Sequence, residues 1–583
     1  MSASLYPRPQ FRRERYEMLD GLWRYRLSDG ESGDIRVPYV YQSRASGIGR
    51  PLPEGQIVYE RAFDVPESWR GSRVILHFGA VDYEAAVYVN DQLVTRHSGG
   101  QTPFGADITP CLRESGPQSL RVEVRDEPCS DRIPRGKQSW TGAGAGIFYT
   151  PSTGIWQSVW MEPVPEAALT LLRCTPDIDR GTLAVEVEVS RECPLPCQVA
   201  LTASLDGQIC ADAAFTLREW RGAAVLDLSG ARTLRGAHFD SRLWWTPEHP
   251  VLFDLEAVLR VDGQPRDRVL SYFGMREVSC ENGKFCLNHR PYPQRLVLDQ
   301  GYWPEGLMTP PAPDAFRLDI ERAKEMGFNG CRKHEKAEDP RFLYWADRLG
   351  YLVWGSVSSF YRFDETAASR HMAEWTQILQ RDYNHPCIVC WDMLNESWGV
   401  PAIRCDKRQQ AYADALYSLA HALDGTRPVI SNDGWEQTRT DICALHSYRH
   451  GGPRDADQRA YFARMAARLD TLDRSGLLEE RRAYAAGCAH AGQPVILSEY
   501  GGMALPGGDG WGYNVTADAG EFLRDFEDLV RVITESGLFC GFCYTQLTDV
   551  EQEQNGLMDA ARRCKVPPEQ LRQIMERHPF RVE

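Results

Sequence analysis

The chain has 583 residues, enough for two to four domains with large cores, and its 43% hydrophobic and 25% charged residues are typical of a soluble globular protein. A net charge of −15 disfavours nucleic acid or an anionic membrane as a partner. No run of about 18 apolar residues is present, so no membrane span is expected.

Two features of the sequence bear on localisation. The first residues show neither an apolar stretch nor a small-residue cleavage site, so no secretory signal is visible. The 17 cysteines are an odd number and are scattered along the chain, which fits a reducing compartment. We therefore expect a cytoplasmic protein.

Residues 1–165 show short alternating strands separated by turns, for example 74–78, 85–89 and 120–124. No long helical pattern interrupts them, so this region is predicted to be a β-sandwich. Residues 166–273 continue with strands at regular spacing, and 183–189 alternates cleanly between apolar and polar side chains. The second region is predicted to be an immunoglobulin-like sandwich.

From residue 274 to 583 apolar strands alternate with amphipathic helices, which predicts a parallel sheet. Eight strands over roughly 300 residues match a (β/α)₈ barrel. The predicted strands end near Leu298, Cys331, Trp354, Leu394, Ser431, Leu445, Ser498 and Thr545. Helices are predicted over residues 314–326, 340–349, 374–382, 408–423 and 519–536.

Two of these strands lead into a glutamate. The apolar run 387–394 is followed by Asn395 and Glu396, and the run 494–498 by Glu499. As the fourth and seventh strands of a barrel they would bring both carboxylates to one rim. A lone strand-end glutamate more often pairs with an arginine, but two in matched positions favour chemistry.

Paired carboxylates of this kind cleave glycosidic bonds. In the retaining mechanism one carboxyl protonates the leaving oxygen and the other attacks the anomeric carbon. We predict that Glu396 is the acid/base and Glu499 the nucleophile. Asn395 is placed to hydrogen-bond a sugar 2-hydroxyl, which is the reason for this order of roles.

The chain resembles glycoside hydrolase family 2, the group of β-galactosidases, β-glucuronidases and β-mannosidases, over nearly its whole length. The resemblance implies three domains in order: a jelly-roll, sugar-binding-like sandwich, an immunoglobulin-like sandwich and a catalytic TIM barrel. It rests on VYVND at 87–91, HSGG at 97–100, TPF at 102–104, TGIWQSVW at 153–160, NESWG at 395–399 and SEYG at 498–501.

The resemblance also implies binding residues in the first two barrel strands. FNGCRKH at 328–334 is similar to the family's second strand, whose final histidine faces the sugar, so His334 is a binding candidate together with Arg332. A strand-end histidine that holds a loop is an equal alternative. Asp299 ends the first strand, where it would bind sugar hydroxyls or cap the following loop.

Four further candidates lie near later strand ends. His446 and Tyr448 end the sixth strand, and the family often places an aromatic hydroxyl near the nucleophile, a role that suits Tyr448. Trp435 and Tyr544 are expected to stack on the sugar, although ordinary packing would explain each of them equally.

Several departures from the family pattern concern the substrate. Ser356 stands where many relatives have an acidic residue, and Gly502 stands where the best-known β-galactosidases have a histidine. The Asn-x-Lys motif that reads a uronate in β-glucuronidases is absent between Glu499 and Gln546, and residues 282–284, which fit it, are interpreted as a turn. These departures disfavour a β-glucuronide and do not by themselves select a β-galactoside. A β-galactoside-type substrate is the prediction, with a β-mannoside, β-glucoside, arabinoside or uronide as alternatives.

A protein of another class is a competing hypothesis: a catalytically silent carbohydrate-binding protein with the same fold. Both glutamates and Asn395 argue against it, whereas Ser356 and Gly502 keep it open. No metal site is predicted and no cofactor is required; some relatives use a magnesium ion near the acid/base residue, and the sequence does not indicate one. The expected partner is a carbohydrate substrate, and a homo-oligomer is left open.

Overall fold

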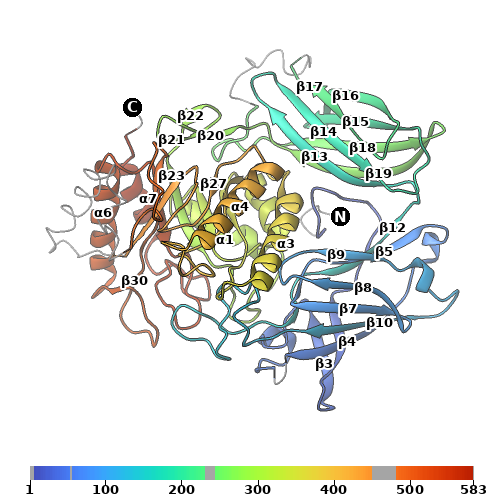
Figure 1. Cartoon of the computed structure of the whole chain (residues 1–583), viewed down its shortest axis with the longest axis horizontal. Coiled ribbons are helices and arrows are strands. Elements are labelled where there is room, and N and C mark those ends of the chain that lie inside the picture. The colour runs from blue at the N-terminus through green and yellow to red at the C-terminus, as the bar shows by residue number, and fades with distance from the viewer. Residues whose placement is uncertain (1–5, 53–54, 230–242, 449–480, 582–583) are drawn as a thin grey trace.

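The structure is a computed structural model that describes residues 6–52, 55–229, 243–448 and 481–581. Figure 1 shows three bodies: a blue sandwich at the N-terminus, a green sandwich beside it and a yellow-to-red barrel that contacts the first sandwich. The fold class is therefore as predicted. Among the described helices, none has the length and apolar character needed to cross a membrane.

The first body packs a four-stranded sheet against a six-stranded sheet. The smaller sheet has the order β1 (Glu17–Met18), β12 (Val159–Val164), β5 (Arg73–Phe78) and β9 (Phe104–Asp107). The larger has the order β3 (Ser32–Val37), β2 (Gly21–Arg26), β4 (Gln56–Phe63), β10 (Gln118–Arg125), β7 (Glu84–Val89) and β8 (Gln92–Ser98). Two short strands, β6 (Val81–Asp82) and β11 (Gly154–Ile155), form a separate pair.

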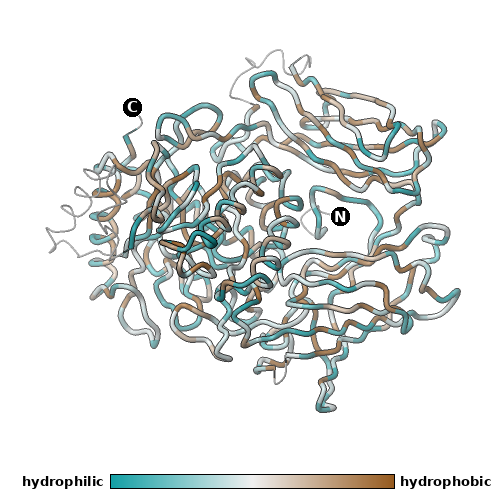
Figure 2. Tube along the Cα trace, in the orientation of Figure 1, coloured by the Kyte–Doolittle hydropathy of each residue, from teal (hydrophilic) through white to brown (hydrophobic). Residues whose placement is uncertain are grey.

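The described residues of the second body form seven antiparallel strands in two sheets, as expected for an immunoglobulin-like sandwich. One sheet has the order β13 (Leu169–Asp177), β14 (Thr182–Val189) and β17 (Arg221–Asp227). The other has the order β16 (Gln208–Leu217), β15 (Cys197–Leu205), β18 (Phe253–Val261) and β19 (Gln264–Phe273). Strand β14 alternates strictly between buried and half-buried residues, because only one face of each sheet meets the core. The same alternation of brown and teal is visible along the strands in Figure 2.

The third body is the predicted barrel, an eight-stranded parallel sheet. Its order is β27 (Val429–Ile430), β26 (Ile388–Asp392), β25 (Leu352–Ser356), β24 (Gly330–Lys333), β23 (Gln294–Asp299), β32 (Gly541–Thr545), β29 (Val495–Gly501) and β28 (Cys443–Ser447). The helices are α1 (Ala315–Glu325), α2 (Pro340–Leu349), α3 (Glu365–Asp382), α4 (Lys407–Leu423), α6 (Ala519–Glu535) and α7 (Pro568–Arg577). Short strands β20 (Val278–Glu281), β21 (Lys284–Leu287), β22 (Arg290–Pro291), β30 (Met503–Ala504) and β31 (Asn514–Val515) complete it.

The barrel strands are nearly continuous runs of apolar residues because both faces of the sheet are buried. Every residue of β26, β29 and β32 is buried. Strands β26 and β29 are the fourth and seventh in chain order, as predicted. The described residues between β27 and β28 form no helix, so this connection is shorter than the ideal barrel pattern.

Two details of the barrel differ from or extend the sequence interpretation. The helix predicted over 374–382 begins earlier, at Glu365, where the Asp364 side chain accepts a hydrogen bond from the Ala367 N–H and caps the first turn. Asn282 and Gly283 have positive φ values and join β20 to β21, which confirms that the Asn-x-Lys sequence at 282–284 is a turn.

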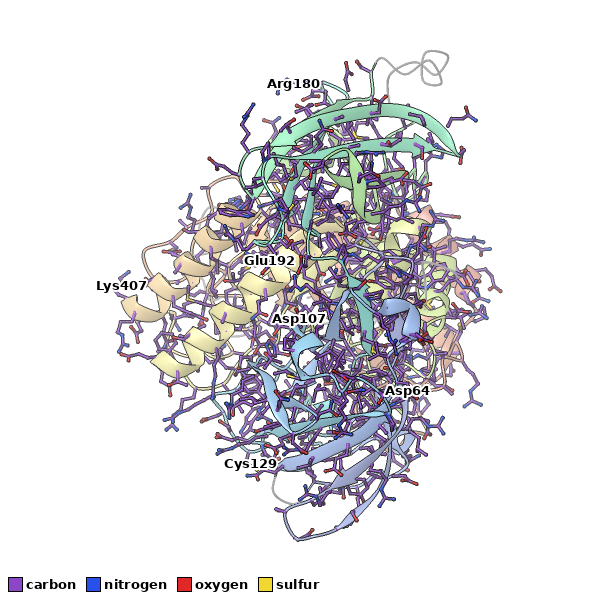
Figure 3. All side chains as sticks on the ribbon, turned by 90° about the vertical axis from the view of Figure 1, so that its right-hand side faces the viewer. Asp64, Asp107, Cys129, Arg180, Glu192 and Lys407 are labelled. Carbon is purple, nitrogen blue, oxygen red and sulfur yellow. The ribbon has the colours of Figure 1, made fainter. Side chains whose placement is uncertain are left out.

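The three bodies are joined by polar contacts as well as packing. Arg73 of the first sandwich lies 2.7 Å from Asp107 in its own sheet and 3.5 Å from Glu192 of the second sandwich. Figure 3 labels both acids at this junction. On the other side, the loop between β10 and β11 lies against the carboxyl ends of the barrel strands, where the Arg135 and Gly136 N–H groups donate to the Ser359 carbonyl at 3.0 and 3.1 Å.

Candidate active site

A small cavity lies at the carboxyl ends of the barrel strands. This is the edge at which active sites of such barrels lie. Five predicted site residues line it: His334, Asn395, Glu396, Tyr448 and Glu499. The other lining residues are Lys137, Ile147, Phe148, Leu298, Gln300, Glu335, Tyr361, Trp398, Tyr513, Thr545 and Glu553.

The two predicted catalytic carboxylates face each other across this cavity. An oxygen of Glu396, an oxygen of Glu499 and a nitrogen of His446 all lie within 4.8 Å of one another. Glu499 is part of β29, whereas Glu396 follows β26 in a turn where Glu396 and Ser397 have φ values of 50° and 60°. This left-handed backbone is costly for non-glycine residues, and strained positions of this kind cluster at functional sites.

Arg332 in β24 lies behind the cavity and contacts two of the residues that line it. Its guanidinium donates to Glu499 Oε1 and to Asn395 Oδ1, each at 2.7 Å. Its Nε lies 2.8 Å from Asp392 and 2.6 Å from Asp433. Arg332 is fully buried and does not line the cavity, so it positions the carboxylate and the amide from behind. Its predicted contact with the sugar is replaced by this network.

The same network leaves the Asn395 amide available to a ligand. Arg332 occupies the Asn395 carbonyl oxygen, so the side-chain NH₂ group is the part of Asn395 that can donate into the cavity. This orientation fits the predicted hydrogen bond to a sugar hydroxyl, which stays a prediction.

His446 lies directly between the acids. Its Nδ1 is 2.8 Å from Glu396 Oε1 and 3.5 Å from Glu499 Oε2, and its Nε2 is 3.2 Å from Asp433 Oδ1. Burial opposes its protonation, but Glu499 and Asp433 outweigh burial and raise the pKa of His446 to about 10. The imidazole is therefore positively charged at neutral pH. Like Arg332, it stands behind the cavity wall and contacts the acids.

Glu499 is ionised for the same electrostatic reason. Burial alone would raise its pKa, but the charge of His446, contact with His334 and the charge of Arg332 hold the pKa of Glu499 well below its usual range. The Tyr448 hydroxyl donates to Glu499 Oε2 at 2.5 Å, which matches the position predicted for an aromatic hydroxyl. An ionised, well-held carboxylate of this kind can act as a nucleophile.

His334 approaches the same carboxylate from the second strand. Its Nε2 lies 3.4 Å from Glu499 Oε1, and its Nδ1 contacts Gln300 Oε1 at 3.0 Å. Burial lowers the pKa of His334 to about 3, so the ring is neutral. It lines the cavity and also holds the Gln300 loop, and its contact with the sugar stays a prediction.

Three predicted residues lie elsewhere. Asp299 is opposite Lys333 in the β23–β24 register and forms an ion pair with it at 2.9 Å, on the face opposite to Arg332. Asp299 also accepts the Gly301 N–H at 2.8 Å, so it caps its loop. Tyr544 packs edge-to-face on Phe526 of α6, and its neighbour in the chain lines the cavity instead.

Trp435 is the third residue outside the cavity. Its ring lies edge-to-face with His446, with centroids 5.6 Å apart, and Arg481 lies 5.2 Å from its centroid. Ordinary packing therefore accounts for Trp435, as the alternative weighed from the sequence proposed.

Sequence reasoning missed the contribution of the first domain and of two further acids. Lys137 and Phe148 come from the β10–β11 loop, which also brings Ile147 to the cavity. Glu335 and Glu553 follow β24 and β32. Only Glu335, one residue after the FNGCRKH motif, carried a sequence signal.

Gly502 has a steric explanation. Its φ is +64°, and a Cβ there would lie 2.4 Å from the Tyr513 ring, which stacks on Tyr448. The Tyr513 ring thus occupies the space that a side chain at position 502 would need. Ser356 is buried at the end of β25 and does not line the cavity.

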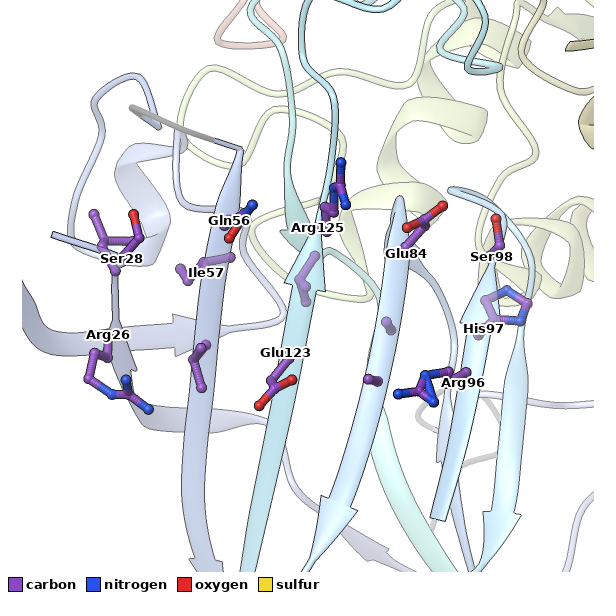
Figure 4. A pocket seen from close by; sticks show the side chains of 15 residues that line it. Arg26, Ser28, Gln56, Ile57, Glu84, Arg96, His97, Ser98, Glu123 and Arg125 are labelled. Atoms are coloured by element: carbon purple, nitrogen blue, oxygen red, sulfur yellow. The ribbon is translucent and has the colours of Figure 1, made fainter. Parts of the chain in front are cut away.

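A wider groove lies on the outer face of the six-stranded sheet (Figure 4). Its acids are neutralised locally: Glu84 faces Arg370 at 3.6 Å, and Glu123 contacts Arg121. It offers no facing pair of carboxylates, so the barrel cavity is the better candidate for chemistry.

Comparison with known proteins agrees with this architecture. The TIM-barrel model of glycosyl hydrolases family 2 matches residues 312–565, and the sugar-binding-domain model of that family matches residues 37–129. The β-galactosidase of Thermoanaerobacter pseudethanolicus is 26% identical over 397 residues, which cover 64% of this chain but only 47% of that protein. The β-glucuronidase of Rattus norvegicus is 26% identical over 501 residues, or 76% of this chain and 73% of that one.

A solved structure extends the likeness to the whole chain. The β-galacturonidase of Eisenbergiella tayi bound to galacturonate superposes with a TM-score of 0.74 at 20% identity, covering 97% of this chain and 98% of that one. At this identity the likeness concerns the fold. The two matched domains make up more than half of the sequence, and the chain therefore belongs to glycosyl hydrolases family 2.

Proposed function

We propose that the protein is a retaining exo-glycosidase that hydrolyses a terminal β-linked sugar by double displacement. The observation that carries the proposal is the approach of Glu396 and Glu499 to within 4.8 Å across one cavity. Retaining enzymes place their carboxyl groups about 5–5.5 Å apart, whereas inverting enzymes need about 6.5–9.5 Å to admit a water molecule.

In the first step, ionised Glu499 attacks the anomeric carbon while Glu396 donates its proton to the glycosidic oxygen, which leaves with the aglycone. In the second step, Glu396 takes a proton from water as that water attacks the anomeric carbon, and Glu499 departs as a carboxylate. Arg332 and Tyr448 hold Glu499 in place throughout. The reaction uses the protein's own carboxylates and needs no cofactor.

For the sugar itself, the sequence prediction is a β-galactoside-type substrate. The curated relatives include proteins named β-galactosidase and β-glucuronidase, so a neutral sugar and a uronic acid are both candidates. A panel of 4-nitrophenyl β-galactoside, β-glucoside, β-mannoside, β-glucuronide and arabinoside substrates separates these classes. A silent carbohydrate-binding protein would release nitrophenolate from none of them.

The roles of the two acids are tested on whichever substrate is cleaved. Glu499→Gln is expected to lower kcat by about 10⁴-fold or more, because the nucleophile is lost. Glu396→Ala is expected to regain turnover with added azide, which replaces water on the glycosyl–Glu499 ester and gives a β-glycosyl azide. Rescue that yields an α-glycosyl azide, or an active Glu499→Gln variant, would refute the assignment.

A further inference from the structure

Lys137 is a lysine of the first domain that reaches the barrel cavity. It is only 7% exposed and lies in the β10–β11 loop. The preceding residue, Gly136, has a φ of +55°, and a Cβ there would lie 2.3 Å from the Glu335 carbonyl oxygen and 2.7 Å from Ser358 Oγ. The loop thus approaches the barrel so closely that only glycine fits, and this contact fixes where Lys137 stands.

The ammonium group of Lys137 has no hydrogen bond or ion pair within the described part of the chain. The ammonium group lies near the rings of Phe148 and Tyr149, at 5.8 and 5.5 Å from their centroids. The other buried lysines differ. Lys333 contacts Asp299 at 2.9 Å and Glu338 at 2.8 Å, and Lys336 donates to two carbonyls and to Glu338.

The charged groups around Lys137 do not neutralise it directly. Glu335 and Glu553 line the same cavity, but neither comes within 4.0 Å of the ammonium group as an ion pair. Both Glu335 oxygens accept hydrogen bonds from Ser359, and Glu553 Oε2 accepts the Tyr149 hydroxyl at 2.7 Å. Burial also raises the pKa of Glu335 to about 7, which weakens its negative charge. A buried ammonium without a partner is costly unless a ligand pairs with it.

We propose that Lys137 is a specificity-determining residue that binds a carboxylate carried by the sugar ring, so that the enzyme prefers a β-linked uronoside. This inference rests on the proposed glycosidase function. Lys137 lines the same small cavity as Glu396 and Glu499, so we place the group that it meets on the sugar ring under attack. An ammonium–carboxylate hydrogen bond is charge-assisted and discriminates strongly against a neutral hydroxymethyl group. The first domain would thereby supply the carboxylate-binding charge.

The test compares the wild type with Lys137→Met, which keeps the length of the side chain and removes its charge. Substrates are 4-nitrophenyl β-galacturonide and β-glucuronide against 4-nitrophenyl β-galactoside and β-glucoside. The wild type is expected to favour a uronoside, and Lys137→Met to lower its kcat/KM on that uronoside by about 10- to 100-fold, the loss of one charged hydrogen bond. On the neutral glycoside the variant should lose little or gain.

Controls separate charge recognition from folding. Lys137→Arg should retain more uronoside activity than Lys137→Met, because it keeps the positive charge. Lys284→Met, at the start of β21 and outside the cavity lining, should change neither substrate class. Equal thermal midpoints for both Lys137 variants and the wild type establish an intact fold. A third substrate, 4-carboxyphenyl β-galactoside, moves the carboxylate to the leaving group.

Each result has one interpretation. Equal losses of Lys137→Met on acidic and neutral sugars, or a wild type that cleaves only neutral glycosides, would overturn the role of Lys137 and leave the glycosidase proposal standing. An effect confined to the 4-carboxyphenyl substrate would overturn the assignment to the sugar ring. Hydrolysis of none of these substrates, nor of the β-mannoside and arabinoside of the wider panel, would count against the proposed function itself.

Discussion

His446 controls the charge balance of the cavity, because it is the positive group that lies between the two acids. It contacts Glu396 at 2.8 Å and Glu499 at 3.5 Å. Burial disfavours its charged form, but Glu499 and Asp433 more than offset burial and raise its pKa to about 10. The imidazolium in turn favours the carboxylate form of Glu499, so the state of the proposed nucleophile depends on its neighbour.

His446→Gln tests this coupling. Removing the positive charge raises the pKa of Glu499, so the acid limb of the kcat/KM profile should move to higher pH. The pH profile of kcat/KM on the preferred aryl glycoside measures the shift. His421→Gln is the matched control, since His421 pairs with Asp441 at 2.8 Å outside the cavity and should leave the profile unchanged. An acid limb that does not move in His446→Gln would show that His446 does not set the charge of Glu499.

At the residue scale, the sequence predicts which residues lie near the ends of buried strands. It does not predict which face of the sheet each of their side chains points to. Glu499 and Tyr448 are found at the cavity because both lie near the carboxyl ends of parallel strands. Asp299 also ends a strand, but it faces Lys333 in the register and points away from the cavity. One residue of parity reverses the direction of a side chain, and an apolar run does not fix that parity.

Among the elements, the β10–β11 loop contributes most to the site beyond the barrel strands. It is pinned by the hydrogen bonds of Arg135 and Gly136 to the Ser359 carbonyl and by the Tyr149 hydroxyl on Glu553 at 2.7 Å. Barrel strands and helices are predictable because their apolar residues recur with a clear period. The first half of α3 is not predictable in this way, because residues 365–373 are mostly polar or small. Only the Asp364 cap marks its start.

Gly136→Ala tests whether loop docking supports the cavity. A Cβ at Gly136 would lie 2.3 Å from the Glu335 carbonyl oxygen, so the loop must shift; we expect about 1–3 kcal/mol of destabilisation and a lower kcat/KM. Gly116→Ala is the control: its φ is +79°, but nothing lies within 4 Å of the added carbon. Thermal midpoints and kcat/KM are compared. Equal behaviour of the two variants would mean that the close approach at Gly136 is unimportant.

At the scale of the whole molecule, the cavity is lined by residues from two domains. Lys137 and Phe148 belong to the first sandwich, whereas the acids belong to the barrel. No local pattern in the sequence shows that a loop from another domain will meet a strand end more than two hundred residues later. The domain order was predictable from strand rhythm and resemblance; the residues at the contact were not.

Arg13→Met tests the assembly of the two sandwiches. Arg13 lies in the N-terminal segment and contacts Asp267 of the second sandwich at 2.8 Å and Glu162 of the first at 3.4 Å, with all three side chains buried. Removing it leaves two buried carboxylates without their cation, which should cost about 3–5 kcal/mol and lower the thermal midpoint. Arg24→Met, which breaks an exposed pair with Asp34, should cost less than about 1 kcal/mol. Equal midpoints in the two variants would contradict this account.

The most direct test of the central claim is the anomeric configuration of the first sugar released, followed by proton NMR during hydrolysis of the preferred aryl β-glycoside. Two carboxylates with oxygens within 4.8 Å of each other imply two displacements, so the β-anomer should appear first and then equilibrate with the α-anomer. Initial release of the α-anomer would contradict the proposed roles of Glu396 and Glu499.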